Sequence, residues 1–188
     1  SGEISIDGIN IMDYKLSSLR KNIGIVLQDV FLFSDTIFNN ITLKDDNIGI
    51  NEVKIAAKQI GVHDFIMSLP NNYYYNVKER GIMLSSGQRQ LIAFLRVYVS
   101  NPQILILDEA TSSIDSASEI LIQNATEKLT KNRTSLIIAH RLATVKKADN
   151  IIVMDSGNII EQGSHKELIN NIDGYYKKLY DVQFQLTS

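Results

Sequence analysis

The stretch Ile104-Leu105-Ile106-Leu107-Asp108-Glu109 decides the fold class. Four consecutive apolar residues predict a buried strand, and two carboxylates follow at its C-terminal end. In open α/β sheets, ligands bind outside the carboxyl ends of the strands. Asp108 is therefore a candidate ligand for a hard cation such as Mg²⁺, and Glu109 could orient or deprotonate a water molecule. Taken alone, these residues also fit a strand that ends in a solvated acidic turn.

Short apolar runs alternate with amphipathic segments along the whole chain, which predicts an α/β fold. The predicted strands are Glu3–Asp7, Ile23–Leu27, Ile104–Leu107, Ser135–Ala139, Ile151–Met154 and Asn158–Glu161. The last two are expected to form a hairpin through Asp155-Ser156-Gly157. Several of these strands read as buried on both faces.

Three predicted helices begin with a capping-box pattern, in which a Ser is followed three residues later by Glu or Gln. These pairs are Ser85 with Gln88, Ser116 with Glu119, and Ser164 with Glu167. The helix after Ser85 is expected to run to about Val99. Helical periodicity is also present between Asn51 and Ser68, whereas Asn71–Asn76 is polar and aromatic and predicts a loop.

Three further positions carry chemistry. Leu84-Ser85-Ser86-Gly87-Gln88 combines hydroxyls, a glycine and a helix N-terminus, which together can bind an anion, although an ordinary capped helix has the same pattern. His140 follows the apolar run Ile137-Ile138-Ala139, and Gln28 follows Gly24-Ile25-Val26-Leu27. Both side chains are therefore expected at strand ends, where Gln28 could hold a metal-bound or attacking water.

The order and spacing of these motifs resemble the nucleotide-binding domain of an ATP-binding cassette (ABC) transporter over nearly the whole chain. Leu84–Gln88 is similar to the LSGGQ signature, Leu105–Glu109 to the Walker B motif, and Ser112–Asp115 to the D-loop. Gln28 resembles the Q-loop glutamine and His140 the switch histidine. Ser86 departs from the family pattern, which usually has glycine there, and its side chain could crowd a phosphate.

The resemblance implies ATP and Mg²⁺ as cofactors and a head-to-tail pair of such domains, as a homodimer or a heterodimer. Glu109, His140 and Gln28 would be catalytic, and Asp108 and Gln28 would contact the metal. Ser85, Ser86, Gly87 and Gln88 would bind the nucleotide held by the second domain. Asp115 would lie at the dimer interface.

The segment after Gln28 and the tripeptide Glu79-Arg80-Gly81 resemble the exporter branch, in which they contact the transmembrane domain. The implied protein is an ATPase that powers export from the cytoplasmic face of the cell (inner) membrane, attached through transmembrane helices that precede Ser1. The expected organisation is a catalytic core portion at 1–35 and 100–188 around a helical subdomain at 36–99. A charged turn alone would also explain Glu79–Gly81.

No G-x-x-x-x-G-K-S/T motif occurs in the 188 residues. The resemblance places this phosphate-binding loop, Walker A, before Ser1. We therefore expect these residues alone to bind and hydrolyse little ATP. We also expect an uncovered apolar sheet face, which favours self-association or domain swapping.

Composition narrows the alternatives. A net charge of −2 gives no reason to expect nucleic acid as a partner, the absence of cysteine excludes disulfides, and no apolar run is long enough to span a membrane. A DNA-associated ABC ATPase would need a long coiled coil between Gln28 and Leu84, where no sustained heptads occur. A soluble ABC protein and a non-catalytic interaction fragment remain alternatives, the former disfavoured by Glu79–Gly81.

Overall fold

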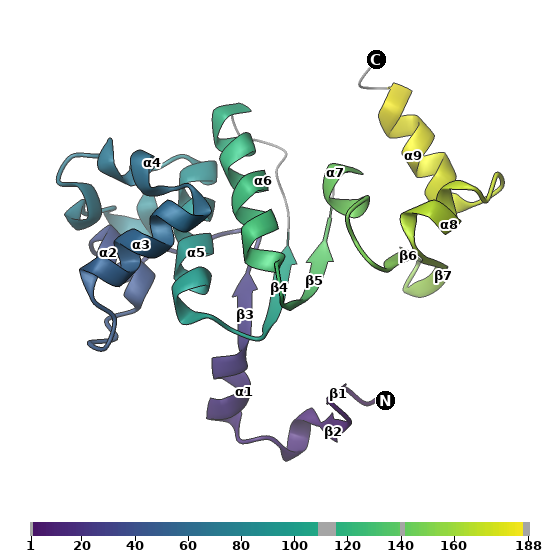
Figure 1. The fold of residues 1–188 in the computed structure, drawn as a ribbon, viewed down its shortest axis with the longest axis horizontal. Coiled ribbons are helices and arrows are strands. Elements are labelled where there is room, and N and C mark those ends of the chain that lie inside the picture. The colour runs from purple at the N-terminus through teal and green to yellow at the C-terminus, as the bar shows by residue number, and fades with distance from the viewer. Residues whose placement is uncertain (1, 109–115, 140–141, 186–188) are drawn as a thin grey trace. The chain divides into compact units, whose positions relative to one another are not determined.

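The computed structural model describes residues 2–108, 116–139 and 142–185. They form two compact units, Ser1–Ile138 and Ala139–Ser188. The first unit contains a three-stranded sheet and most of the helices (Figure 1).

The sheet of the first unit is parallel, with the strand order β3-β4-β5. Its strands are β3 (Ile23–Val26), β4 (Ile104–Asp108) and β5 (Thr134–Ile138). In register, Ile25 pairs with Ile106, and Ile106 pairs with Leu136. The α/β class with a parallel sheet is thus confirmed.

Helices cover one face of this sheet. The helices of the first unit are α1 (Leu16–Asn22), α2 (Ile37–Thr42), α3 (Ile50–Ile60), α4 (His63–Met67), α5 (Ser86–Ser100) and α6 (Ser116–Thr130). Short 3₁₀ turns are η1 (Ile11–Asp13), η2 (Asn72–Tyr74) and η3 (Glu79–Gly81). Of these helices, α5 is the central one, since it packs against α2, α3, α6 and β3.

The main hydrophobic core surrounds α5 and extends from the covered sheet face to α2, α3 and α6. Val26, Leu105 and Leu107 point into it, together with Leu91 and Phe94 of α5. The alternate residues point the other way, and Ile25 and Leu136 are 52% and 58% exposed. The side chains of a strand alternate between its two faces. The prediction that these strands are buried on both faces is therefore confirmed for the face that packs against the helices and wrong for the opposite face, as far as the described residues go.

The N-terminal strand prediction needs correction. Glu3–Asp7 is not one strand: β1 (Ser5–Ile6) pairs antiparallel with β2 (Ile9–Asn10). Asp7 and Gly8 form the turn, both with positive φ (51° and 79°), as a two-residue type I′ hairpin requires. The Asp-Gly pair is itself the sequence signal for this turn.

Two smaller differences occur elsewhere in the first unit. The expected loop at Asn71–Asn76 contains the 3₁₀ turn η2. Helix α6 already includes Ser116, which the sequence pattern placed just before the helix. The division into a catalytic core portion at 1–35 and 100–188 around a helical subdomain at 36–99 stays a prediction.

The second unit has its own small core. It contains α7 (Leu142–Val145), β6 (Ile151–Asp155), β7 (Asn158–Gly163), α8 (His165–Ile169) and α9 (Tyr175–Gln185). The predicted hairpin is confirmed, since β6 and β7 are antiparallel and the turn residues Ser156 and Gly157 have positive φ. Ile151, Val153, Leu168 and Tyr176 form the buried cluster.

Candidate functional site

The carboxyl edge of the sheet brings together two of the predicted site residues, Gln28 and Asp108. Val26 pairs with Leu107 in the parallel register, so the chain leaves β3 toward Gln28 at the same edge where Asp108 ends β4. Gln28 is exposed and Asp108 is partly exposed. An amide oxygen and a carboxylate are hard donors that suit Mg²⁺ when phosphate or water oxygens complete the coordination.

Three predicted site residues, Glu109, Asp115 and His140, lie outside the described residues. The strands that lead to two of them are nevertheless defined. Asp108, which precedes Glu109, pairs with Ile138, which lies two residues before His140. Within the described residues, no group of three or more His, Cys, Asp or Glu side chains could hold a metal ion by itself.

The N-terminus of α5 carries the predicted capping box. The Ser85 N–H donates to Gln88 Oε1 (3.0 Å), and the Gln88 N–H donates to Ser85 Oγ (3.2 Å). Ser85 and Ser86 are exposed, whereas Gly87 is buried. The exposed hydroxyls of Ser85 and Ser86, at the positive end of the dipole of this 15-residue helix, can bind an anionic group.

The tripeptide Glu79-Arg80-Gly81 forms a strained turn just before this helix. Lys78, Arg80 and Gly81 all have positive φ (60°, 51° and 68°), which is unfavourable for the two residues that carry a side chain. At Gly81, a Cβ atom would meet Leu32 Cδ1 at 3.0 Å and Arg89 Cδ at 3.1 Å. The turn is therefore packed tightly against the segment that follows Gln28.

A groove of about 400 Å³ opens where this turn meets that segment. Its lining residues are Val30, Glu79, Arg80, Ile82 and Arg89. The Arg89 guanidinium donates from Nη1 to the Leu84 carbonyl (2.7 Å). This bond fixes the Arg89 side chain next to the turn.

Two exposed phenylalanines belong to the same segment. Phe31 and Phe33 are 55% and 53% exposed and form an edge-to-face pair with ring centroids 5.1 Å apart. Exposed aromatic surface of this kind is typical of a protein–protein contact.

Sequence reasoning did not single out the side chains that hold this segment in place, Asn40 and Arg96. Asn40 is completely buried, and its side chain accepts from the Phe33 N–H (2.7 Å) and donates to the Phe33 carbonyl (3.0 Å). Arg96 of α5 donates to the Asn40 carbonyl. The available signal was a charged residue in the apolar run Ile92–Val99.

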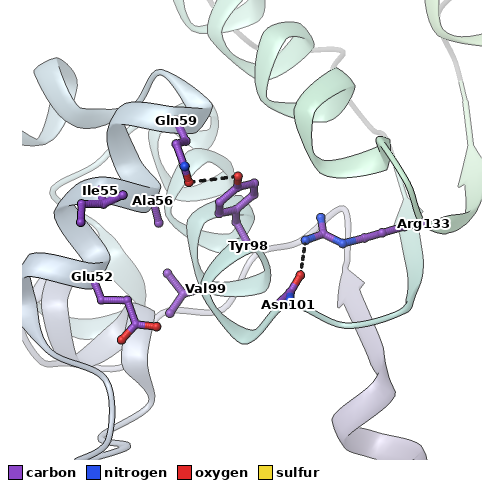
Figure 2. Close-up of a pocket in the computed structure, with 8 residues that line it drawn as sticks. All are labelled: Glu52, Ile55, Ala56, Gln59, Tyr98, Val99, Asn101 and Arg133. Atoms are coloured by element: carbon purple, nitrogen blue, oxygen red, sulfur yellow. Dashed lines mark hydrogen bonds between the residues drawn. The ribbon is translucent and has the colours of Figure 1, made fainter.

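Another pocket, of about 470 Å³, lies between α3 and the end of α5 (Figure 2). Tyr98 donates to Gln59 Oε1 (3.1 Å), and Arg133 donates to Asn101 Oδ1 (2.8 Å). Because Asn101 and Arg133 precede β4 and β5, this pocket lies at the amino edge of the sheet, away from Gln28 and Asp108. It takes no part in the candidate site.

Comparison with known proteins shows which family has this fold and these motifs. The family model described as ABC transporter matches residues 1–112. The chain is 51% identical over 183 residues to a Staphylococcus aureus protein named as a multidrug export ATP-binding/permease protein. It is 49% identical over the same length to YgaD of Bacillus subtilis, which carries the same description.

A solved structure of a bacterial Atm1-family ABC exporter with ATP bound matches with a TM-score of 0.86 and 43% identity, covering 97% of this chain and 32% of that one. The two curated matches also cover 97% of this chain, but only 32% and 31% of the relatives. The chain therefore spans about a third of the length of the curated relatives that it matches. Within the described residues, no helix is long and apolar enough to cross a membrane.

The parallel sheet, its carboxyl edge and the capped helix thus have the fold of an ABC ATPase core. The chain belongs to the ABC transporter family.

Proposed function

We propose that this chain is the ATP-hydrolysing portion of an ABC exporter, which powers transport through a transmembrane domain. The observation that carries the proposal is the groove in which Glu79–Gly81 meets the segment after Gln28, directly before the signature helix α5. The relatives' description as multidrug export ATP-binding/permease proteins supports it. Coupling of ATP hydrolysis to transport requires a surface that contacts both the nucleotide site and the membrane partner. This groove borders the signature helix, which is proposed to act at the nucleotide site, and the segment after Gln28, which is proposed to contact the membrane partner.

The proposed reaction is phosphoryl transfer from Mg-ATP to water. Asp108 would hold Mg²⁺, directly or through water, and Gln28 would orient the metal or the attacking water. Glu109 would accept the proton from that water, and His140 would contact the γ-phosphate. Since such transition states need little covalent help, positioning and electrostatic stabilisation by these residues account for the catalysis.

The signature residues are proposed to act on a nucleotide bound by a second domain. The hydroxyls of Ser85 and Ser86, the Gly87 backbone and the Gln88 side chain would contact its phosphates, helped by the positive end of the α5 dipole. Although Ser85 Oγ accepts from the Gln88 N–H, a hydroxyl keeps its own proton for donation. Asp115 would lie at the interface between the two domains, which form a homodimer or heterodimer.

The docking surface is proposed to consist of Phe31, Phe33 and the turn Glu79-Arg80-Gly81. The aromatic pair would bury apolar area against helices of the transmembrane domain, and the charged turn would fix their orientation. This arrangement would place the domain at the cytoplasmic face of the cell membrane. No nucleic-acid partner is proposed, since the net charge of the chain is −2.

The proposal is tested with Glu109→Gln in the assembled exporter. The amide cannot accept the proton of the attacking water, so turnover should fall by at least about 100-fold, the usual contribution of a general base. ATP should be retained without hydrolysis, as measured by nucleotide trapping and phosphate release. Glu52→Gln, an exposed change on α3 at the other pocket, is the control and should keep normal turnover. Normal turnover in Glu109→Gln would refute the general-base assignment.

A second prediction concerns a polypeptide of these 188 residues alone. It contains no G-x-x-x-x-G-K-S/T loop, whose backbone N–H groups supply most of the contacts to the β- and γ-phosphates. Isothermal titration with Mg-ATP should therefore show no binding tighter than about 1 mM. The full-length Staphylococcus aureus relative serves as the positive control. Micromolar affinity of the 188-residue polypeptide would contradict the expectation.

A further inference from the structure

The segment Phe31–Phe33 is attached to the helices rather than to the sheet. Leu32 is completely buried, so the flanking side chains of Phe31 and Phe33 point outward. The Asn40 side chain holds the backbone of Phe33 from both sides, through its N–H and its carbonyl, and donates a further bond to the Thr36 carbonyl (3.0 Å). Three bonds from one buried amide leave this segment little freedom to move independently of α2.

Arg96 connects the same segment to the signature helix α5. Its Nε donates to the Asn40 carbonyl (2.8 Å), and its guanidinium also reaches the Phe31 carbonyl, at a longer distance of 3.4 Å. Asn40 lies in the last turn of α2, where carbonyl groups lack intrahelical partners. A cation is favourable at that end of a helix dipole, so Arg96 completes the C-terminus of α2 from a neighbouring helix.

Stability alone is a weak reason for this arrangement. Burial lowers the pKa of the Arg96 guanidinium, which records the cost of placing a charge there. Replacing buried charged groups by apolar residues of similar size is often neutral or stabilising. Ile92 and Ala93, which lie one turn before Arg96 on the same side of α5, are buried and apolar, so an apolar side chain would suit this part of the helix. What Arg96 adds is a fixed geometry between two elements.

The two elements joined are the ones that the proposed function uses. Arg96 lies eight residues after Gln88 on one continuous helix, which is a distance of about 12 Å along its axis. A displacement of Phe31 and Phe33 by a membrane partner would therefore be transmitted through Asn40 and Arg96 to the helix that begins with the signature residues.

We infer that Arg96 and Asn40 are positioning residues that couple the Phe31–Phe33 docking surface to the signature helix. The inference rests on the proposed exporter function and adds the residues through which its two sites communicate. Neither side chain needs to touch nucleotide or transported substrate. Removing the link should leave basal hydrolysis intact but make it insensitive to the transported molecule.

The test uses the assembled exporter with Arg96→Met, Arg96→Lys and wild type. ATPase kcat and KM are measured with and without ethidium, a lipophilic cation used as the transported probe. Wild type should be stimulated. Arg96→Met should keep basal kcat and KM within about two-fold and lose most of the stimulation, since coupling between sites is typically worth about five-fold or more. Arg96→Lys should be intermediate, because it keeps the charge and donors but loses the rigid planar fork that fixes the two carbonyls relative to each other.

Arg133→Met is the matched control. Arg133 also donates to a backbone carbonyl at a helix end, that of Leu129 (2.6 Å), but it lies at the amino edge of the sheet (Figure 2). It should keep the wild-type stimulation even if the melting temperature falls.

The outcomes separate the inference from the proposed function. Wild-type stimulation in Arg96→Met would overturn the inference. If Arg96→Met does not assemble, wild-type stimulation in Arg96→Lys would overturn it equally. Absence of ATPase activity or of stimulation in the wild-type protein would instead refute the exporter proposal, and the inference with it.

Discussion

At the scale of single residues, Asp35 shows how one carboxylate orders the start of α2. Its Oδ2 pairs with Lys44 Nζ (2.9 Å), and its Oδ1 accepts from the Thr36 N–H (2.7 Å) and from Asn39 Nδ2 (2.8 Å). The Lys44 ammonium, followed by these two donors, lowers the pKa of Asp35 to about 2. The ionised form is therefore the one that the folded state prefers.

This preference predicts an acid dependence of stability. Because the folded-state pKa is below the unfolded value of about 3.9, the carboxylate stabilises the fold above about pH 4, and this contribution is lost as the pH falls toward 2. In urea unfolding between pH 2 and 7, the difference in unfolding free energy between wild type and Asp35→Asn should be largest at neutral pH, fall steeply below about pH 4 and be smallest at pH 2. Lys44→Met should move the loss partway toward pH 4. A difference that does not depend on pH would contradict this assignment.

Residue positions set by local sequence were predictable, and those set by long-range contacts were not. Gln28 and Asp108 were expected at strand ends and lie there, because an apolar run followed by a polar residue defines a strand end locally. Asn40 and Arg96 are 56 positions apart in sequence. No local pattern specifies that they meet, so their bond required the structure. The catalytic roles assigned to site residues stay predictions.

At the scale of elements, β3 depends on a close approach to the chain that enters β4. A Cβ atom on Gly24 would lie 2.6 Å from Pro102 Cγ and 2.7 Å from Val97 Cγ1, both shorter than atoms tolerate. The glycine therefore lets β3 pack against the end of α5, which positions the strand that leads to Gln28.

Gly24→Ala should consequently destabilise the protein. Overpacking of this kind typically costs about 1–3 kcal/mol, because the neighbouring side chains or the strand must shift. Gly49→Ala is the control, since nothing lies within 4 Å of its added Cβ, and its cost is confined to the preference of an N-cap for glycine over alanine, about 1 kcal/mol or less. Chemical denaturation of both variants measures the difference. Equal stability would show that β3 can relax away from Pro102.

Elements with a local start signal were predicted better than those without. The capping boxes at Ser85 and Ser164 are confirmed because each is completed within one helical turn. Helices α1, α2, α7 and α9 were not predicted. The case of α2 gives the physical reason: Thr36 caps its start locally, but a six-residue helix also depends on its packing against α5 and on Arg96 at its C-terminus, neither of which is visible in its own sequence.

At the scale of the whole molecule, the exposed sheet face is the feature with the largest energetic consequence. Ile25, Ile106 and Leu136 align on one rung across all three strands, and Ile138 follows on β5. Ile25, Leu136 and Ile138 are each more than half exposed. Full burial of a Leu or Ile side chain contributes about 1.5–3 kcal/mol, and each of these half-exposed side chains would gain roughly half of that, so contact of this face with another apolar surface is favourable.

A polypeptide of these 188 residues should therefore self-associate through this face. Multi-angle light scattering should show a mass that rises with concentration above that of the monomer. The double change Ile25→Lys and Leu136→Lys puts two charges on the central rung, where burial would cost far more than it returns, and should shift the polypeptide to monomer. Met12→Lys, at a position 84% exposed in η1 and away from the sheet, controls for the added charge and should leave association unchanged. A wild-type polypeptide that stays monomeric at all concentrations would show that the sheet face is protected. If Met12→Lys also dissociated the oligomer, the net charge of the polypeptide, rather than the sheet face, would control association.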